Sequence, residues 1–126
     1  MFFLKCVINK YGSVYVDDNV IARIVGFCAI ECYGIVGMAI RNIKDGMAQL
    51  LKKENLTKGI KIYNEKDNGE KSLDKIIIEL HIILEYGTNI QALADVLNDT
   101  IRYKIEDNLG ICISKINISV ESIRVD

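Results

Sequence analysis

The side chains best suited to acid–base or nucleophilic chemistry are few in this sequence. There is one histidine, His81, and there are four cysteines, at positions 6, 28, 32 and 112. Nucleophilic catalysis needs a nucleophile, a base within hydrogen-bond reach and usually a group that orients the base. His81 lies in the run Glu79–Ile82, whose composition predicts a strand. We therefore interpret it as an outward-facing or hydrogen-bonded strand residue rather than as a catalytic base.

The cysteines do not have the spacing of a metal site. Cys28 and Cys32 are four residues apart, so on a helix they would share one face, but the sequence contains no C-x-x-C pair and no second histidine. We interpret the cysteines as reduced, buried, small hydrophobic side chains. A thiol-dependent activity of Cys28 or Cys32 is the one enzyme hypothesis left open. No P-loop or G-x-G-x-x-G motif occurs either, so the sequence predicts a non-enzymatic protein with no catalytic residue, no cofactor and no metal.

Glycines and lysines supply the candidates for contact with a partner. Gly34-Ile35-Val36-Gly37 matches the G-x-x-G form of the loop with which KH domains clamp an RNA backbone. Its two central residues are apolar and the net charge is −1, so we favour a turn that ends a helix. Small turns still let another backbone approach closely, and clustered lysines attract acidic partners. Gly34, Gly37, Lys52, Lys53 and Lys58 are therefore the candidate partner-binding residues, with a solvated face as the alternative for the lysines.

The composition is that of one globular domain spanning residues 1–126. Half of the residues are hydrophobic and 26% are charged, which is enough apolar material for one core. The apolar start of the chain is too short for a signal peptide, and no run reaches the roughly 20 residues that span a bilayer. We expect a cytoplasmic protein without a transmembrane segment of its own. Residues 1–11 are an extra N-terminal segment, and for Phe2–Leu4 we favour a strand.

Periodicity predicts an α+β fold. The helices expected from apolar spacing and capping residues run from Asp17 to about Cys32, from Ile43 to Lys53 and from Ile90 to Asp107. The expected strands are Val14–Val16, Ile60–Tyr63, Lys75–Glu85 and Ile116–Val120, while Ile35–Ile40 fits a strand or a loop. The predicted architecture is a single two-layer domain: a mainly antiparallel or mixed sheet of about four strands, with two to three helices packed on one face.

Seven short motifs in a fixed order resemble the alkaline shock protein family, over roughly residues Gly12 to Val125. Each motif alone is weak, but the order is specific. The sequence departs from the family pattern at Tyr33, where relatives often have proline, and in its extension Phe2–Val7. The motifs are Gly12–Asp18, Gly34–Met38, Asp45–Leu51, Leu56–Ile60, Glu85–Gly87 with Ile90, Leu109-Gly110 and Ile116–Val120.

The resemblance implies a function that composition and spacing do not reveal. Such proteins are cytoplasmic and often membrane-proximal, serve cell-envelope stress homeostasis in Gram-positive-type bacteria and have no known catalytic residues. The resemblance thus implies a scaffold or interaction protein that forms a homo-oligomer or docks on a membrane-anchored protein. Some relatives are tied to fatty-acid synthesis, so its regulation by protein contact is one alternative, and KH-like RNA binding at Gly34–Gly37 is another. Binding to DNA is not expected.

Overall fold

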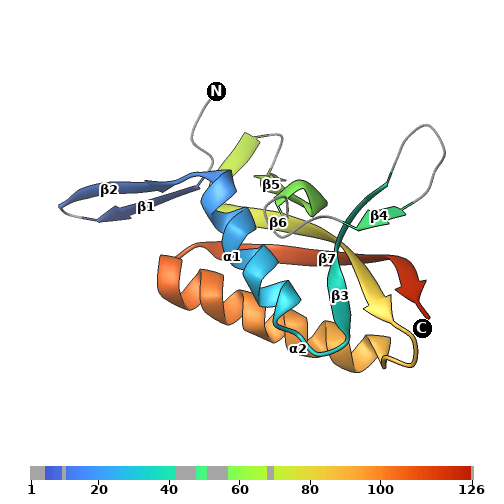
Figure 1. The fold of residues 1–126 in the computed structure, drawn as a ribbon. Helices are drawn as coiled ribbons and strands as arrows, with labels where there is room; N and C mark the ends of the chain where they lie inside the picture. Colours follow the sequence, from blue (N-terminus) through green and yellow to red (C-terminus); the bar gives the residue numbers. More distant parts are fainter. Residues whose placement is uncertain (1–4, 10, 42–47, 51–56, 68–69, 126) are drawn as a thin grey trace.

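The computed structural model describes residues 5–9, 11–41, 48–50, 57–67 and 70–125 (Figure 1). It contains seven strands, two α-helices and one π-helical turn, η2, within these residues. In chain order these elements are β1 Lys5–Asn9, β2 Gly12–Val16, α1 Asp18–Ile30, β3 Ile35–Arg41, β4 Ala48–Leu50, β5 Ile60–Asp67, β6 Glu70–Glu85, α2 Ile90–Arg102, η2 Tyr103–Asp107 and β7 Cys112–Arg124.

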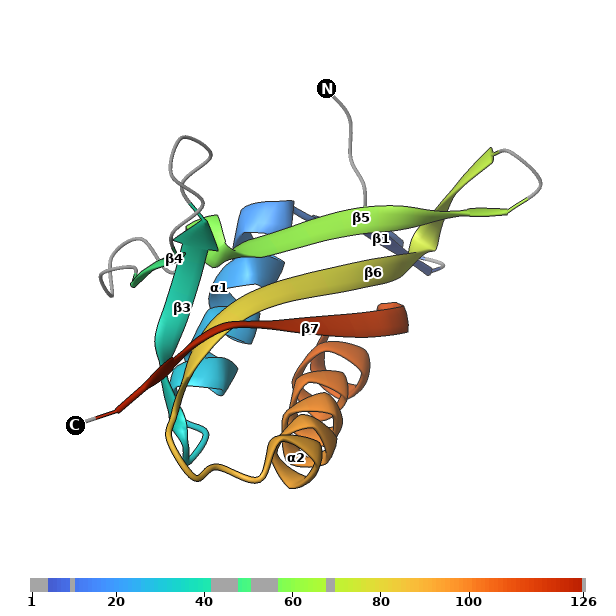
Figure 2. The ribbon, with the colours of Figure 1, turned by 90° about the vertical axis from the view of Figure 1, so that its right-hand side faces the viewer.

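Strand β6 is the centre of the main sheet because it has neighbours along both edges. On one edge β7 runs parallel to it, from the pair Lys75 and Cys112 to the pair Glu85 and Arg124. On the other edge β5 pairs antiparallel up to Leu80, and β3 takes over antiparallel at Ile82–Leu84. With β4 added beside β3, the sheet is mixed and has five strands (Figure 2).

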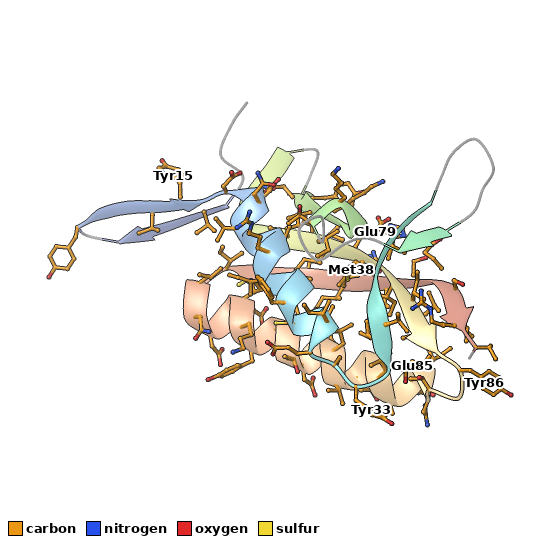
Figure 3. All side chains as sticks on the ribbon, in the orientation of Figure 1. Tyr15, Tyr33, Met38, Glu79, Glu85 and Tyr86 are labelled. Atoms are coloured by element: carbon orange, nitrogen blue, oxygen red, sulfur yellow. The ribbon has the colours of Figure 1, made fainter. Side chains whose placement is uncertain are left out.

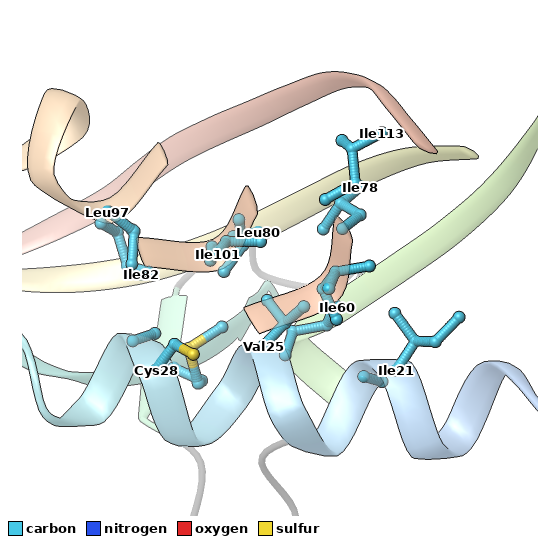
Figure 4. Packing of buried hydrophobic residues seen from close by; sticks show 14 of the residues in the cluster. Ile21, Val25, Cys28, Ile60, Ile78, Leu80, Ile82, Leu97, Ile101 and Ile113 are labelled. Atoms are coloured by element: carbon cyan, nitrogen blue, oxygen red, sulfur yellow. The ribbon is translucent and has the colours of Figure 1, made fainter. Parts of the chain in front are cut away.

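Both α-helices cover the same face of this sheet. Side chains at alternate positions of β6 point into the helix layer and are at most 1% exposed: Ile76, Ile78, Leu80, Ile82 and Leu84. They form one hydrophobic cluster with Ile21 and Val25 of α1 and with Leu97 and Ile101 of α2 (Figure 4). The predicted α+β class, with a mixed sheet and helices on one face, is confirmed.

The third predicted helix, Ile90–Asp107, is present but changes form near its end. Asn89 caps α2 by accepting a hydrogen bond from the backbone N–H of Ala92, as its short polar side chain favours. After Arg102 the chain widens into the π-helical turn η2. Ile105, in the middle of this turn, is fully buried in the same cluster as Leu97, so the wider turn still contributes to the core.

A hairpin of β1 and β2 forms a separate two-stranded sheet that projects from the domain (Figure 1). The extra N-terminal segment therefore contains a strand, Lys5–Asn9. Phe2–Leu4, for which the sequence favours a strand, lie outside the described residues. Tyr11, at the turn of the hairpin, is 86% exposed.

The predicted helix Ile43–Lys53 is wrong where the structure describes it. Ala48–Leu50 form β4, which pairs antiparallel with Ala39–Arg41 of β3. The backbone groups on that edge of β3 require partners, and an interior glycine, Gly46, lowers helix propensity here. The remainder of the predicted helix, 43–47 and 51–53, lies outside the described residues. The segment Ile35–Ile40, which fits a strand or a loop by sequence, is part of β3.

Two glycines in neighbouring turns allow a matched stability test. Gly34, between α1 and β3, has φ +97°, and a Cβ there would lie 2.8 Å from Cγ2 of Thr88. Gly87, between β6 and α2, has φ +88°, and a Cβ there would meet nothing within 4 Å. Replacing either with alanine should cost about 1–2 kcal/mol of unfolding free energy through the positive φ alone. Gly34→Ala should cost at least about 1 kcal/mol more than Gly87→Ala because of the added contact.

Urea unfolding of both variants, followed by circular dichroism, measures this difference. Equal losses would contradict the tight packing of the two turns. Thr88→Ser in the Gly34→Ala background is the control, because it removes the closest atom and should recover part of the loss.

Candidate functional site

The helix-free face of the sheet carries a polar cluster centred on His81. Residues of β6 that alternate with the buried positions point to this face. The two ring nitrogens of His81 lie 2.8 Å from Oε1 of Glu79 and 2.9 Å from Oε2 of Glu121. Ser119 donates its hydroxyl to the same Glu121 oxygen at 2.6 Å, and Tyr63 donates to Oε2 of Glu79 at 3.3 Å. Three strands, β5, β6 and β7, thus supply one connected network.

The ring of His81 is held between two carboxylates. The side chain of His81 is 25% exposed and that of Glu121 only 7%, so the pair is partly removed from water. With both nitrogens occupied, the ring has no free atom to activate a nucleophile.

The phenol of Tyr63 extends this network to β5. Partial desolvation, the negative charge of Glu79 and the hydrogen bond to that carboxylate all raise the pKa of Tyr63 above its usual 10.0. The neutral, donating form of the phenol is therefore favoured over the tyrosinate. Tyr63 acts as a hydrogen-bond donor that fixes Glu79, not as an acid or base near neutral pH.

The structure separates the glycines and lysines that the sequence singles out. Gly34 lies buried in the turn after α1, where its carbonyl accepts a hydrogen bond from the N–H of Glu85. Gly37 is buried within β3, opposite Ile83 of β6. Lys58 is exposed, in the turn 57–59 that precedes β5, and Lys52 and Lys53 lie outside the described residues. Gly34 and Gly37 therefore belong to different elements and do not form one exposed loop.

The cluster around His81 is the feature that sequence reasoning missed. Its hydrogen-bonded pairs include residues up to 40 positions apart, so no single segment of the sequence contains the cluster. A signal exists in the spacing, because Glu79 and His81, and likewise Ser119 and Glu121, are two residues apart and so share a face of their strand. Only the parallel register, which sets His81 beside Ser119, brings the two pairs together.

The described cysteines differ in exposure. Cys28 is buried, as predicted, and Cys32 is only half-buried, but Cys112, at the start of β7, is exposed, so the prediction of burial is wrong there. Burial raises the pKa of both Cys28 and Cys32 above 9.0, and for Cys28 the charge of Glu31 adds to this while Lys104 opposes it. A raised pKa lowers the thiolate fraction at neutral pH and hence the nucleophilicity of these two thiols.

Two surface cavities are lined by described residues. One, of about 400 Å³, is lined by Asn19, Val20, Arg23 and Thr57. The other, of about 280 Å³, is lined by Glu85, Tyr86, Arg124 and Val125. The described lining of neither cavity includes a histidine or a cysteine. Across the residues described in the structure, no three His, Cys, Asp or Glu side chains are arranged to hold a metal ion.

Exposed tyrosines lie in two turns and on the projecting hairpin (Figure 3). Tyr33 and Tyr86, in the turns after α1 and β6, are 93% and 76% exposed, and Tyr15, on the projecting hairpin, is 54% exposed. Aromatic side chains of this kind are enriched in protein interfaces. Together with the polar face around His81, they define a small α+β protein that presents polar and aromatic side chains on its surface.

Comparison with known proteins assigns the family. Residues 7–125 match the alkaline shock protein 23 family, which is described as having a cell envelope-related function. The chain belongs to this family. The resemblance seen in the seven motifs is thereby confirmed, along nearly the whole chain.

Curated relatives match over most of both chains. The uncharacterized protein YloU of Bacillus subtilis is 38% identical over 118 residues, which cover 93% of this chain and 92% of that protein. The uncharacterized protein Spy1614 of Streptococcus pyogenes serotype M6 is 33% identical with the same coverage. The uncharacterized protein YqhY of Bacillus subtilis is 27% identical over 91% of this chain and 79% of its own length. No solved structure matches.

No helix in the described part of the chain is both long enough and apolar enough to cross a bilayer.

Thiol labelling tests the contrast among the cysteines. At pH 7.5 a maleimide should modify Cys112 at least tenfold faster than Cys28, because Cys112 is exposed whereas Cys28 is buried with a raised pKa. Mass spectrometry of peptides from the native protein measures both rates, and labelling in urea is the control for intrinsic reactivity. Fast native modification of Cys28 would contradict its place in the core and would revive a thiol-dependent activity.

Alkaline titration tests the link between Tyr63 and Glu79. Glu79→Gln should lower the pKa of Tyr63 towards its usual value, because it removes the carboxylate charge that disfavours the tyrosinate. Absorbance at 295 nm follows the titration, and Tyr63→Phe identifies its share of the signal. Since the folded pKa lies above 10.0, the contribution of Tyr63 to stability should be present below that pH and be lost as the pH rises through the folded value. An unchanged titration in Glu79→Gln would rule out the interaction.

Proposed function

We propose that this chain is a non-enzymatic interaction protein that serves cell-envelope stress homeostasis by binding other proteins. The observation that carries the proposal is the polar face around His81, in which the ring nitrogens, Glu79, Glu121, Ser119 and Tyr63 satisfy one another. A catalytic site keeps a base or nucleophile available for the substrate. A fixed set of polar side chains on a sheet face instead suits recognition, because little side-chain entropy is lost on binding.

The family supports the cellular setting of this proposal. Its description places related proteins in a cell envelope-related function. We infer that the protein acts in the cytoplasm and reaches the membrane through self-association or through docking on a membrane-anchored protein.

A basic region beside β5 is the proposed contact with such a partner. Lys58 and Lys61 are exposed, and so is Arg23 of α1, which lines the cavity of about 400 Å³ together with Thr57. Lys52 and Lys53, which lie outside the described residues, are close to Lys58 in the sequence. Positive charges of this kind steer association with an acidic surface and act mainly on the association rate.

Charge reversal tests this contact. The triple substitution of Lys52, Lys53 and Lys58 by glutamate should reduce binding to membranes from the same cells about tenfold, since three charge contacts of about 0.5 kcal/mol each sum to roughly 1.5 kcal/mol. Sedimentation with these membranes measures binding. The control is Lys75→Glu, which reverses the charge of an exposed lysine outside this region, on β6. This variant should bind as the wild type does.

Protease treatment of the membranes identifies the kind of partner. If binding depends on a membrane protein, digestion of that protein before mixing should abolish sedimentation. Binding that survives digestion would point to lipid. A wild-type protein that neither binds membranes nor self-associates would overturn the proposed function.

A further inference from the structure

The helix-free face of β6 and β7 is an unusual surface for a parallel strand pair. The two strands run parallel from the pair Lys75 and Cys112 to the pair Glu85 and Arg124. Parallel strands are usually covered by helices on both faces, whereas α1 and α2 both contribute to the core on the other face. The strand pairing thus favours a further layer on the helix-free face, and the described part of the chain places no α-helix there.

Two rows of side chains cross this face from β5 through β6 to β7. Glu79 marks the face, because it is bonded to His81 in the polar cluster. Register partners on neighbouring strands project to the same face, and so do residues two apart on one strand. The first row is Tyr63, Ile77 and Lys115, and the second row is Lys61, Glu79 and Asn117.

The accessible charges of these rows are positive, although the net charge of the chain is −1. Lys61 and Lys115 are exposed, and none of the ion pairs among the described residues involves either of them. The carboxylates of this face, on Glu79 and Glu121, are bonded within the polar cluster, and their side chains are 30% and 7% exposed. An occupant of the face should therefore supply carboxylates to the two lysines.

An apolar spot lies between the two lysines. Ile77, in the middle of the first row, is half-buried, and Tyr63 beside it is 44% exposed. Covering these side chains with an apolar group is favourable because it removes their surface from water. The hydroxyl of Tyr63 is held by its hydrogen bond to Glu79, so little side-chain entropy is lost when the ring is covered. The face therefore suits a segment that is both acidic and apolar.

A helix of a protein fits this surface better than a nucleic acid or an extended strand. Sheet faces that bind single-stranded nucleic acids use several stacked aromatic side chains and a basic groove. Tyr63 is the only aromatic residue of the two rows, and the chain has no basic excess. Extended segments pair with sheet edges, whereas the face of a sheet is the surface on which helices pack.

The spacing of the two lysines matches two turns of a helix. Neighbouring strands lie about 4.8 Å apart, and residues two apart along a strand lie about 6.6 Å apart. Lys61 and Lys115 are two strands and one row apart, which places their Cα atoms about 12 Å from each other on this geometry. Residues i and i+7 of an α-helix share a side and lie about 10.5 Å apart, with residues i+3 and i+4 between them.

We propose that the helix-free face binds an amphipathic acidic helix of a partner protein. Carboxylates at positions i and i+7 of this helix pair with Lys61 and Lys115, and apolar residues at i+3 and i+4 pack on Ile77 and Tyr63. Lys75, which is also exposed, lies beyond Ile77 on β6 and outside the line that joins the two lysines. The proposal rests on the proposed role of the polar face in recognition and names the chemistry of the segment recognised.

A defined peptide tests the pairing. The probe is a labelled peptide of about 18 residues, long enough to form a helix, with glutamate at i and i+7, leucine at i+3 and i+4, and alanine and glutamine elsewhere. At about 20 mM salt, where charges are weakly screened, fluorescence anisotropy should give a Kd on the order of 100 µM. Lys61→Glu combined with Lys115→Glu should weaken binding at least about tenfold. Lys104→Glu, at an exposed lysine of η2, is the matched control and should bind as the wild type does.

A charge swap locates the peptide on this face. A second peptide, with lysine in place of both glutamates, should bind the doubly reversed protein about as tightly as the first peptide binds the wild type, because both pairs are again of opposite charge. Ile77→Ala should weaken the binding of the first peptide to the wild-type lysines, because it removes the apolar contact. Circular dichroism of each variant verifies that it is folded.

The possible outcomes separate this inference from the proposed function. Loss of binding on charge reversal and its recovery in the swap support the acidic helix. A first peptide that does not bind the wild type at about 500 µM, or that ignores both lysine substitutions, overturns the inference and leaves the membrane-binding test unaffected. A single-stranded oligouridine that binds more tightly than the peptide and displaces it would show that the face takes a nucleic acid, and the acidic helix would be wrong.

Discussion

The structure depends on the burial of one strand. Alternate side chains of β6, from Ile76 to Leu84, are at most 1% exposed, which is possible only if both helices cover that face and strands pair with both edges. Burying five large aliphatic side chains contributes about 1.5–3 kcal/mol each before the entropy cost of ordering them. Because residues of a strand alternate between faces, this burial also fixes Glu79 and His81 on the opposite face. The core thus determines where the polar surface lies.

The polar cluster also disfavours any other register between β6 and β7. A slip of one residue would move His81 to the helix face, where the polar ring and its carboxylates would lose water without their present partners. The correct register instead satisfies both ring nitrogens at 2.8 Å and 2.9 Å. The hydrophobic pattern and these hydrogen bonds therefore favour the same alignment. This agreement explains how a long parallel strand pair is specified although its two strands are separated by a helix.

Local patterns predict the elements better than their pairing. The apolar stripe of α2 and the alternation of Ile116–Val120 identify a helix and a strand directly, and they lead to the correct fold class. The helix predicted at Ile43–Lys53 is wrong at Ala48–Leu50 because pairing with β3 overrides a weak helical pattern. The cluster around His81 is missed because its parts are joined only by long-range register. The exposure of Cys112 is missed for a related reason, since burial of a cysteine depends on which end of an edge strand it occupies.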